Sequence, residues 1–136
     1  MAGNATDYLE TKLLQHSLRV AAFTMPPALF CALCTSLPTD ATPGGEVTGG
    51  GYARQPFTFS VTGNQGSNAT TQDFPAATSA WGTVGWTELW DAVTGGNRLY
   101  WFPLVDPVDL VTPITKTIAT GDIMRIPAGG MVITAD

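Results

Sequence analysis

The sequence predicts a mainly β protein, an antiparallel β-sandwich of about seven or eight strands with one N-terminal α-helix. Three observations support this class. Short runs of β-branched and aromatic residues alternate with turn residues along most of the chain. Charged residues make up 12% of the sequence, whereas about 25% is typical, and the 15 glycines and 10 prolines favour tight turns. Leucines recur at helical spacing only near the N-terminus.

One amphipathic helix is predicted over about residues 5–20, because four leucines recur there near helical spacing. Asp7 and Glu10 are placed as a possible capping box. Pro26 and Pro27 end the helical pattern, since neither can donate a backbone hydrogen bond. The four leucines are Leu9, Leu13, Leu14 and Leu18.

Two segments with strand patterns follow the helix. Residues 28–35 form a continuous apolar run of strand length, which is typical of a central strand covered on both faces. Residues 56–61 alternate apolar and polar side chains and predict a half-buried strand. Residues 36–51 and 62–70 are rich in turn residues and predict loops.

The clearest hairpin signal lies in the second half of the chain. Residues 83–93 and 98–104 are separated by Thr94-Gly95-Gly96-Asn97, whose glycines supply the positive φ angles of a tight reversal. Residues 105–113 contain Pro107 and Pro113 and predict an irregular or edge segment. The remaining predicted strands are short and cover residues 71–74, 115–119, 123–126 and 131–134.

Size and charge limit the possible partners. A chain of 136 residues predicts one domain over 1–136, with the sandwich from about residue 28 onward, and can bury roughly two thirds of its unfolded surface. The net charge is −5 and the six basic residues are scattered, so nucleic-acid binding is not expected. No apolar run reaches the 18 or so residues of a membrane span, and no secretory signal is present. Synthesis and assembly in the cytoplasm are therefore expected.

The sequence offers little for catalysis. The one histidine, His16, lies inside the predicted helix, so a Ser-His-Asp or Cys-His arrangement would have to be built on a helical residue. Four carboxylates could form a glycosidase pair, but exposed, solvated side chains are the preferred interpretation. We expect no catalytic, metal-binding or cofactor-binding residue. The four carboxylates are Glu88, Asp91, Asp106 and Asp109.

Cys31 and Cys34 lie within a predicted strand. Residues three apart in a strand point to opposite faces and do not readily bond to each other. Buried free thiols are the preferred interpretation, and a disulfide to another subunit is the alternative.

An aromatic cluster gathers around the predicted hairpin. Along residues 83–92, the even-numbered side chains share one face and Thr87 and Leu89 share the other, so the rings do not all enter one core. Either some tryptophan is left for a partner, or both sheet faces are buried and every ring is core. The cluster is Trp81, Trp86, Trp90, Tyr100, Trp101 and Phe102, and the even-numbered set is Val84, Trp86 and Trp90.

The run Gly49-Gly50-Gly51-Tyr52-Ala53-Arg54-Gln55 is the most distinctive in the chain. Three consecutive glycines allow positive φ angles and a close approach to another strand or chain. With several other strings, this run resembles a family of short bacteriophage virion proteins commonly labelled phage tail fiber proteins. The other strings are Pro38-Thr39-Asp40, Phe74-Pro75-Ala76-Ala77, Trp81-Gly82-Thr83-Val84, residues 90–100, and the closing Gly121-Asp122 to Ala128-Gly129 segment.

The resemblance implies a non-enzymatic structural protein of a tailed-phage virion. It leaves open a tail fiber or tail component and a capsid decoration protein. Expected partners are other virion proteins and further copies of the chain, since the low charge suits a surface covered by neighbours. The alternative is a receptor- or carbohydrate-binding module that uses exposed tryptophans and binds a host glycan. Candidate contact residues are Leu9, Leu13, Leu18, Tyr52, Arg54, Trp86 and Trp101.

Overall fold

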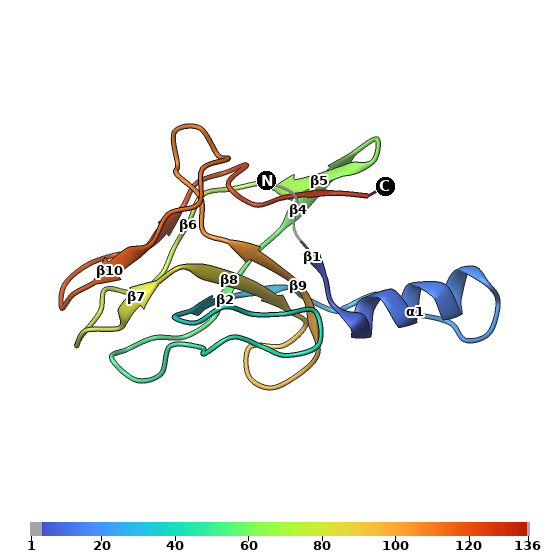
Figure 1. Cartoon of the computed structure of the whole chain (residues 1–136), viewed down its shortest axis with the longest axis horizontal. Coiled ribbons are helices and arrows are strands. Elements are labelled where there is room, and N and C mark those ends of the chain that lie inside the picture. The colour runs from blue at the N-terminus through green and yellow to red at the C-terminus, as the bar shows by residue number, and fades with distance from the viewer. Residues whose placement is uncertain (1–3, 136) are drawn as a thin grey trace.

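A five-stranded antiparallel sheet forms the centre of the computed structural model, which describes residues 4–135 (Figure 1). Its strand order is β1-β9-β8-β2-β3, so the predicted hairpin of β8 and β9 and the predicted central strand β2 lie side by side. These predictions are confirmed. The strands are β1 (Asn4–Ala5), β2 (Phe30–Cys34), β3 (Gln55–Pro56), β8 (Trp86–Trp90) and β9 (Arg98–Pro103).

Three smaller sheets pack around the central one. The first has the order β12-β5-β4, with β4 (Phe59–Thr62), β5 (Gln65–Asn68) and β12 (Val132–Thr134). The second pairs β6 (Gln72–Asp73) with β11 (Arg125–Ile126), and the third pairs β7 (Gly82–Val84) with β10 (Lys116–Ile118). Every strand pairing in residues 4–135 is antiparallel. The predicted mainly β, antiparallel class is therefore confirmed.

The number of strands is larger than predicted, because several segments pair over only two or three residues with different partners. The described residues contain 12 strands. The short strand at 71–74 and the three closing strands are confirmed as β6, β10, β11 and β12. Residues 105–113 are irregular as predicted, with a single bridge between Val105 and Pro113.

The hydrophobic core lies between the central sheet and the smaller sheets, in a sandwich-like arrangement. One face of the central sheet contributes Leu33, Leu89 and Phe102. The smaller sheets and their connections contribute side chains that are almost fully buried. They include Phe57, Phe74, Val84, Ile118, Met124, Ile126 and Met131.

The helix α1 spans Asp7–Ser17 and is shorter than the predicted 5–20 (Figure 1). Its N-cap is Thr6, so the predicted capping box starting at Asp7 is wrong. The Thr6 hydroxyl accepts from the Leu9 N–H at 3.3 Å and donates to the Arg98 carbonyl at 2.7 Å. A capping side chain that also reaches β9 fixes where the helix leaves the sheet.

The segment from Pro56 to Val61 is not one strand, which corrects the sequence prediction. The chain leaves the central sheet after β3, and the Phe57 N–H donates to the Leu29 carbonyl at 2.9 Å. After Phe57 the chain enters β4, which belongs to the three-stranded sheet. Val61 is 75% exposed rather than half-buried, and part of the predicted loop 62–70 is β5, joined to β4 by a turn at Gly63-Asn64.

The three glycines at 49–51 behave as predicted. All have positive φ, at 73°, 60° and 77°. A Cβ on Gly50 would come within 2.8 Å of the Trp81 ring, and the Gly50 carbonyl accepts from the Trp81 indole N–H at 2.8 Å. The close approach is thus to a side chain of the same chain.

Cys31 and Cys34 are free and buried on opposite faces of β2. Burial raises the pKa of each thiol, and the nearby carboxylates of Glu46 and Glu88 raise it further. A protonated, inaccessible thiol is a poor nucleophile. A disulfide to another subunit would require β2 to separate from its neighbouring strands and expose a thiol.

We expect both thiols to be unreactive in the native protein. A chromogenic thiol reagent at mildly alkaline pH should titrate two thiols only after denaturation, with native reaction at least about a hundredfold slower. Absorbance measurements with and without denaturant check this. Prompt titration of either thiol in the native state, or a covalent dimer in non-reducing electrophoresis, would contradict the burial argument.

Candidate functional site

The central sheet has one apolar and one polar face. Thr87 and Leu89 of β8 point into the core and are buried, as the alternation predicted. The opposite face of the sheet carries Trp86 and Glu88. Val84, predicted to share the face of Trp86, instead lies in the core, because β7 is a separate strand that pairs with β10.

A buried ion pair lies at the centre of the polar face. Glu88 has a side-chain exposure of 0%, and its Oε2 accepts from Arg98 Nη1 at 3.1 Å and from the Gly44 N–H at 2.9 Å. Its Oε1 accepts from the Trp90 indole N–H at 3.3 Å. Because both carboxylate oxygens have donors, the charge is compensated without water.

Arg98 extends this network to the loop and the helix. Its Nη2 donates to the carbonyls of Thr39 and Asp40. The Asp40 carbonyl also accepts from the Asp7 N–H at 3.1 Å, and its carboxylate accepts from the Trp101 indole N–H at 2.8 Å. One buried cation therefore holds the loop of residues 36–51 against β9 and the start of α1.

A second network lies beside the first. Glu46 accepts two hydrogen bonds from Arg54, at 2.9 and 2.8 Å, in the bidentate geometry of strong ion pairs. The Tyr52 hydroxyl donates to Glu46 at 2.7 Å and accepts from the Leu33 N–H at 3.0 Å. Burial raises the pKa of Tyr52, and the Glu46 hydrogen bond adds to this, so the phenol is neutral. The Arg54 guanidinium stacks 4.1 Å from the Trp90 ring.

A shallow pocket of about 270 Å³ lies between the helix start and the hairpin loop. Trp90 and Tyr8 are its aromatic residues, and Asp40, Asn97 and Arg98 supply polar atoms. This combination of an aromatic ring and hydrogen-bonding groups is the kind that binds small polar ligands.

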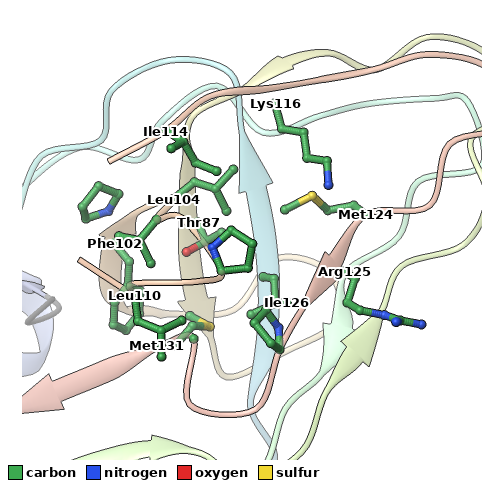
Figure 2. Close-up of a pocket in the computed structure, with 15 residues that line it drawn as sticks. Thr87, Phe102, Leu104, Leu110, Ile114, Lys116, Met124, Arg125, Ile126 and Met131 are labelled. Carbon is green, nitrogen blue, oxygen red and sulfur yellow. The ribbon is translucent and has the colours of Figure 1, made fainter. Parts of the chain in front are cut away.

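A smaller cavity, shown in Figure 2, lies inside the sandwich. Its volume is about 50 Å³. Side chains from β8, β9 and the C-terminal third, including Phe102, Leu104, Ile114, Met124 and Met131, surround the space. It has room for a few water molecules and none for a sugar or a peptide. We interpret it as imperfect core packing.

A larger apolar groove lies where the three-stranded sheet, α1 and the segment before β2 diverge. Its volume is about 390 Å³, and none of its lining residues is charged. One wall is the inner face of the three-stranded sheet, where Val61, Gly66 and Ile133 are cross-strand neighbours. Leu9, Leu13, Phe23, Pro26, Leu29, Phe59, Leu89, Leu99 and Tyr100 complete most of the lining.

The structure separates the predicted contact residues into two groups. Leu9 is buried against the groove at 4% exposure, and Arg54 and Tyr52 are occupied by Glu46 inside the chain. The other group is accessible. It consists of Leu13 at 46% and Leu18 at 69% exposure, and of the half-buried Trp86 and Trp101 on the polar face.

The sequence did not indicate the positions of several residues on these surfaces. Glu88 was predicted to be an exposed, solvated carboxylate, and this prediction is wrong. It is fully buried on the face of Trp86 and Trp90, because Arg98, the Gly44 N–H and the Trp90 indole compensate its charge. Val61 and Ile133 lie in predicted strands whose pairing partners the sequence did not specify. The groove they line depends on the pairing of β5 with both β4 and β12, which no local pattern specifies.

His16 has a local structural contact, since its Nδ1 accepts from the Phe23 N–H at 3.1 Å. Among residues 4–135, no three His, Cys, Asp or Glu side chains are grouped to hold a metal ion. In the same part of the chain, no helix has the length and apolar character needed to cross a bilayer.

Comparison with known proteins defines the class. A family model described as podophage GP4 fiber I protein gp80 matches residues 4–134, nearly the whole chain. The match defines a structural protein of the phage fiber type, a component of the virion. The chain belongs to this podophage fiber I family. No curated protein matches it.

Replacing Glu88 with Gln should destabilise the fold by about 3–5 kcal/mol, because Arg98 would remain buried without its counter-charge. Urea unfolding followed by tryptophan fluorescence measures the change. The matched control is Asp73→Asn, which breaks the exposed Asp73–Arg125 pair and should have little effect. Equal, small effects of both variants would contradict the role assigned to Glu88.

Proposed function

We propose that this chain is a non-enzymatic building block of the phage fiber, made in the host cytoplasm and assembled by docking on other virion proteins and on further copies of itself. The observation that carries the proposal is exposed apolar surface in two places, the groove and the side of α1 that does not line it. Leu14 and Leu18 on α1 are 60% and 69% exposed. Large apolar patches on a soluble domain mark sites of protein contact.

The distribution of charge supports docking rather than catalysis. The buried carboxylate in the described residues, Glu88, accepts hydrogen bonds on both oxygens from donors of the chain itself. It presents no free carboxylate to a substrate. The fiber family assigned to the chain favours the fiber over capsid decoration as the location.

The test is incorporation into particles. Phage carrying Leu13→Ser and Leu18→Ser together should contain about tenfold less of the chain per purified particle, because two accessible apolar contacts are lost. Quantitative mass spectrometry of particles gives the copy number, and immunogold labelling gives its position. Leu37→Ser, an equally apolar change at a 61% exposed site elsewhere, is the control.

Absence of the wild-type chain from purified particles, or turnover of a substrate by the purified protein, would overturn the proposal. Equal incorporation of the double variant and the control would show that Leu13 and Leu18 are not part of the docking surface.

A second candidate function is recognition of a host glycan at the shallow pocket beside Trp90. The observation in its favour is that Trp86, Trp90 and Trp101 share the polar face, where Trp101 contacts Asp40 and Trp90 lines the pocket with Asp40 and Asn97. Indole faces stack on sugar rings while polar side chains bind the hydroxyl groups.

Glycan-array binding tests this candidate. If it is correct, Trp101→Ala and Asn97→Ala should each lower the signal of the bound glycan about tenfold, because a stacking surface or a hydrogen-bonding side chain is removed. Leu37→Ser should leave it unchanged. The absence of any bound glycan for the wild-type protein would exclude it.

A further inference from the structure

Strand β4 forms an open edge beside the apolar groove. Within residues 4–135 its one strand neighbour is β5, and it ends its sheet. Three of its four residues, Ser60, Val61 and Thr62, are exposed. The groove opens next to this edge, with Phe59 and Val61 of β4 in its lining.

The hydrogen-bond pattern shows which backbone groups of β4 are available. Thr62 faces Gln65 across the two-residue turn, and the Thr58 carbonyl accepts from the Ala69 N–H at 2.9 Å. The backbone N–H and C=O groups of the even-numbered residues in this segment therefore point toward β5. By alternation, Phe59 and Val61 direct their N–H and C=O groups outward, at the free edge.

β4 is the longest strand that ends a sheet in residues 4–135, with four residues against two or three for the others. β3 contains Pro56 and spans two residues, and β1 also spans two residues. β4 has four residues, Phe-Ser-Val-Thr, with no charge, no proline and no register shift in its pairing. Sheet edges of soluble proteins are normally protected by such features. An unprotected edge that adjoins an uncharged groove is suited to another strand.

We propose that two copies of this chain pair through β4, antiparallel about a two-fold axis, so that the two three-stranded sheets become one continuous sheet. A two-fold rotation relates antiparallel edge strands, so each copy presents the same surface to the other. Phe59 and Val61 of both copies then lie on the groove side and cover the open apolar space. The uncharged lining selects an apolar occupant, and the partner's β4 supplies one. The inference deepens the proposed function by naming one contact between copies.

The experiment measures the oligomeric state. Sedimentation velocity of the wild-type protein at micromolar concentration should show a dimer. Val61→Lys should weaken the dimer at least about a hundredfold, because a charge would enter an uncharged contact. The control is Val111→Lys, the same change at a 61% exposed site outside the groove, and it should leave the dimer intact.

A second variant separates the groove from the strand edge. A Cβ on Gly66 meets no atom closer than 3.6 Å, and its φ is not in the left-handed region. Gly66→Leu should therefore fill the groove without unfolding the sheet, and should weaken the dimer at least about tenfold by displacing the partner's side chains. Circular dichroism checks the fold.

A wild-type protein that stays monomeric overturns the inference, as does a dimer that is unaffected by both Val61→Lys and Gly66→Leu. A monomer that binds a different virion protein through β4 also overturns it, since the occupant would not be a second copy. Incorporation of a monomeric chain into particles would leave the proposed function standing, whereas absence from particles would remove that function independently.

Discussion

The buried pair of Glu88 and Arg98 is the interaction on which the polar half of the molecule depends. The central sheet must bury both faces, and the core layer covers only one. The other face is covered by the loop of residues 36–51, which carries few large apolar side chains. Glu88 binds this loop through the Gly44 N–H, and Arg98 binds it through the carbonyls of Thr39 and Asp40. Fixed donors and acceptors thus hold the loop on this face, as apolar packing holds the core layer on the opposite face. The pair tolerates burial because both Glu88 oxygens and both Arg98 Nη groups are hydrogen-bonded.

The same network determines where the apolar surface of the chain must lie. The Asp40 carbonyl meets the first turn of α1, and the Thr6 hydroxyl meets β9, so the start of the helix is fixed against the sheet. Leu9 is the buried residue of the helix. Beyond it the helix extends away from the sandwich (Figure 1), and Leu14 and Leu18 are left in solvent because nothing in the described residues covers them. The firm attachment of one end and the exposure of the other make the helix a protruding element rather than a core element.

The sequence predicted the elements better than their partners. The buried run of β2, the hairpin of β8 and β9, and the three closing strands follow from local patterns of apolar residues and turns. The two misassigned strand residues, Val84 and Val61, share one cause, which is that pairing between distant segments overrides local pattern. Val84 fits the alternation that includes Trp86, but it lies in the separate strand β7, because it pairs with Lys116 of β10. Val61 obeys the alternation of Phe57 but belongs to another sheet from β3, because β5 pairs with β4. The polar networks join residues as far apart as Gly44 and Glu88, 44 positions, and Thr39 and Arg98, 59 positions. At such separations the sequence spacing carries no information.

Sequestration of charge links the fold to assembly. Of the six Lys and Arg residues in the sequence, Arg54 and Arg98 are used inside the polar face, where they bind carboxylates and loop carbonyls. The groove lining contains no ionisable residue other than Tyr100, whose pKa is raised by burial. Covering this groove therefore removes no charged side chain of the groove from water, so the free-energy cost of charge desolvation is small. The contact energy then comes from apolar area and from the backbone groups of a sheet edge, both of which are present at β4. The fold thus buries two ion pairs, Glu88–Arg98 and Glu46–Arg54, at the polar face and leaves an uncharged groove beside β4.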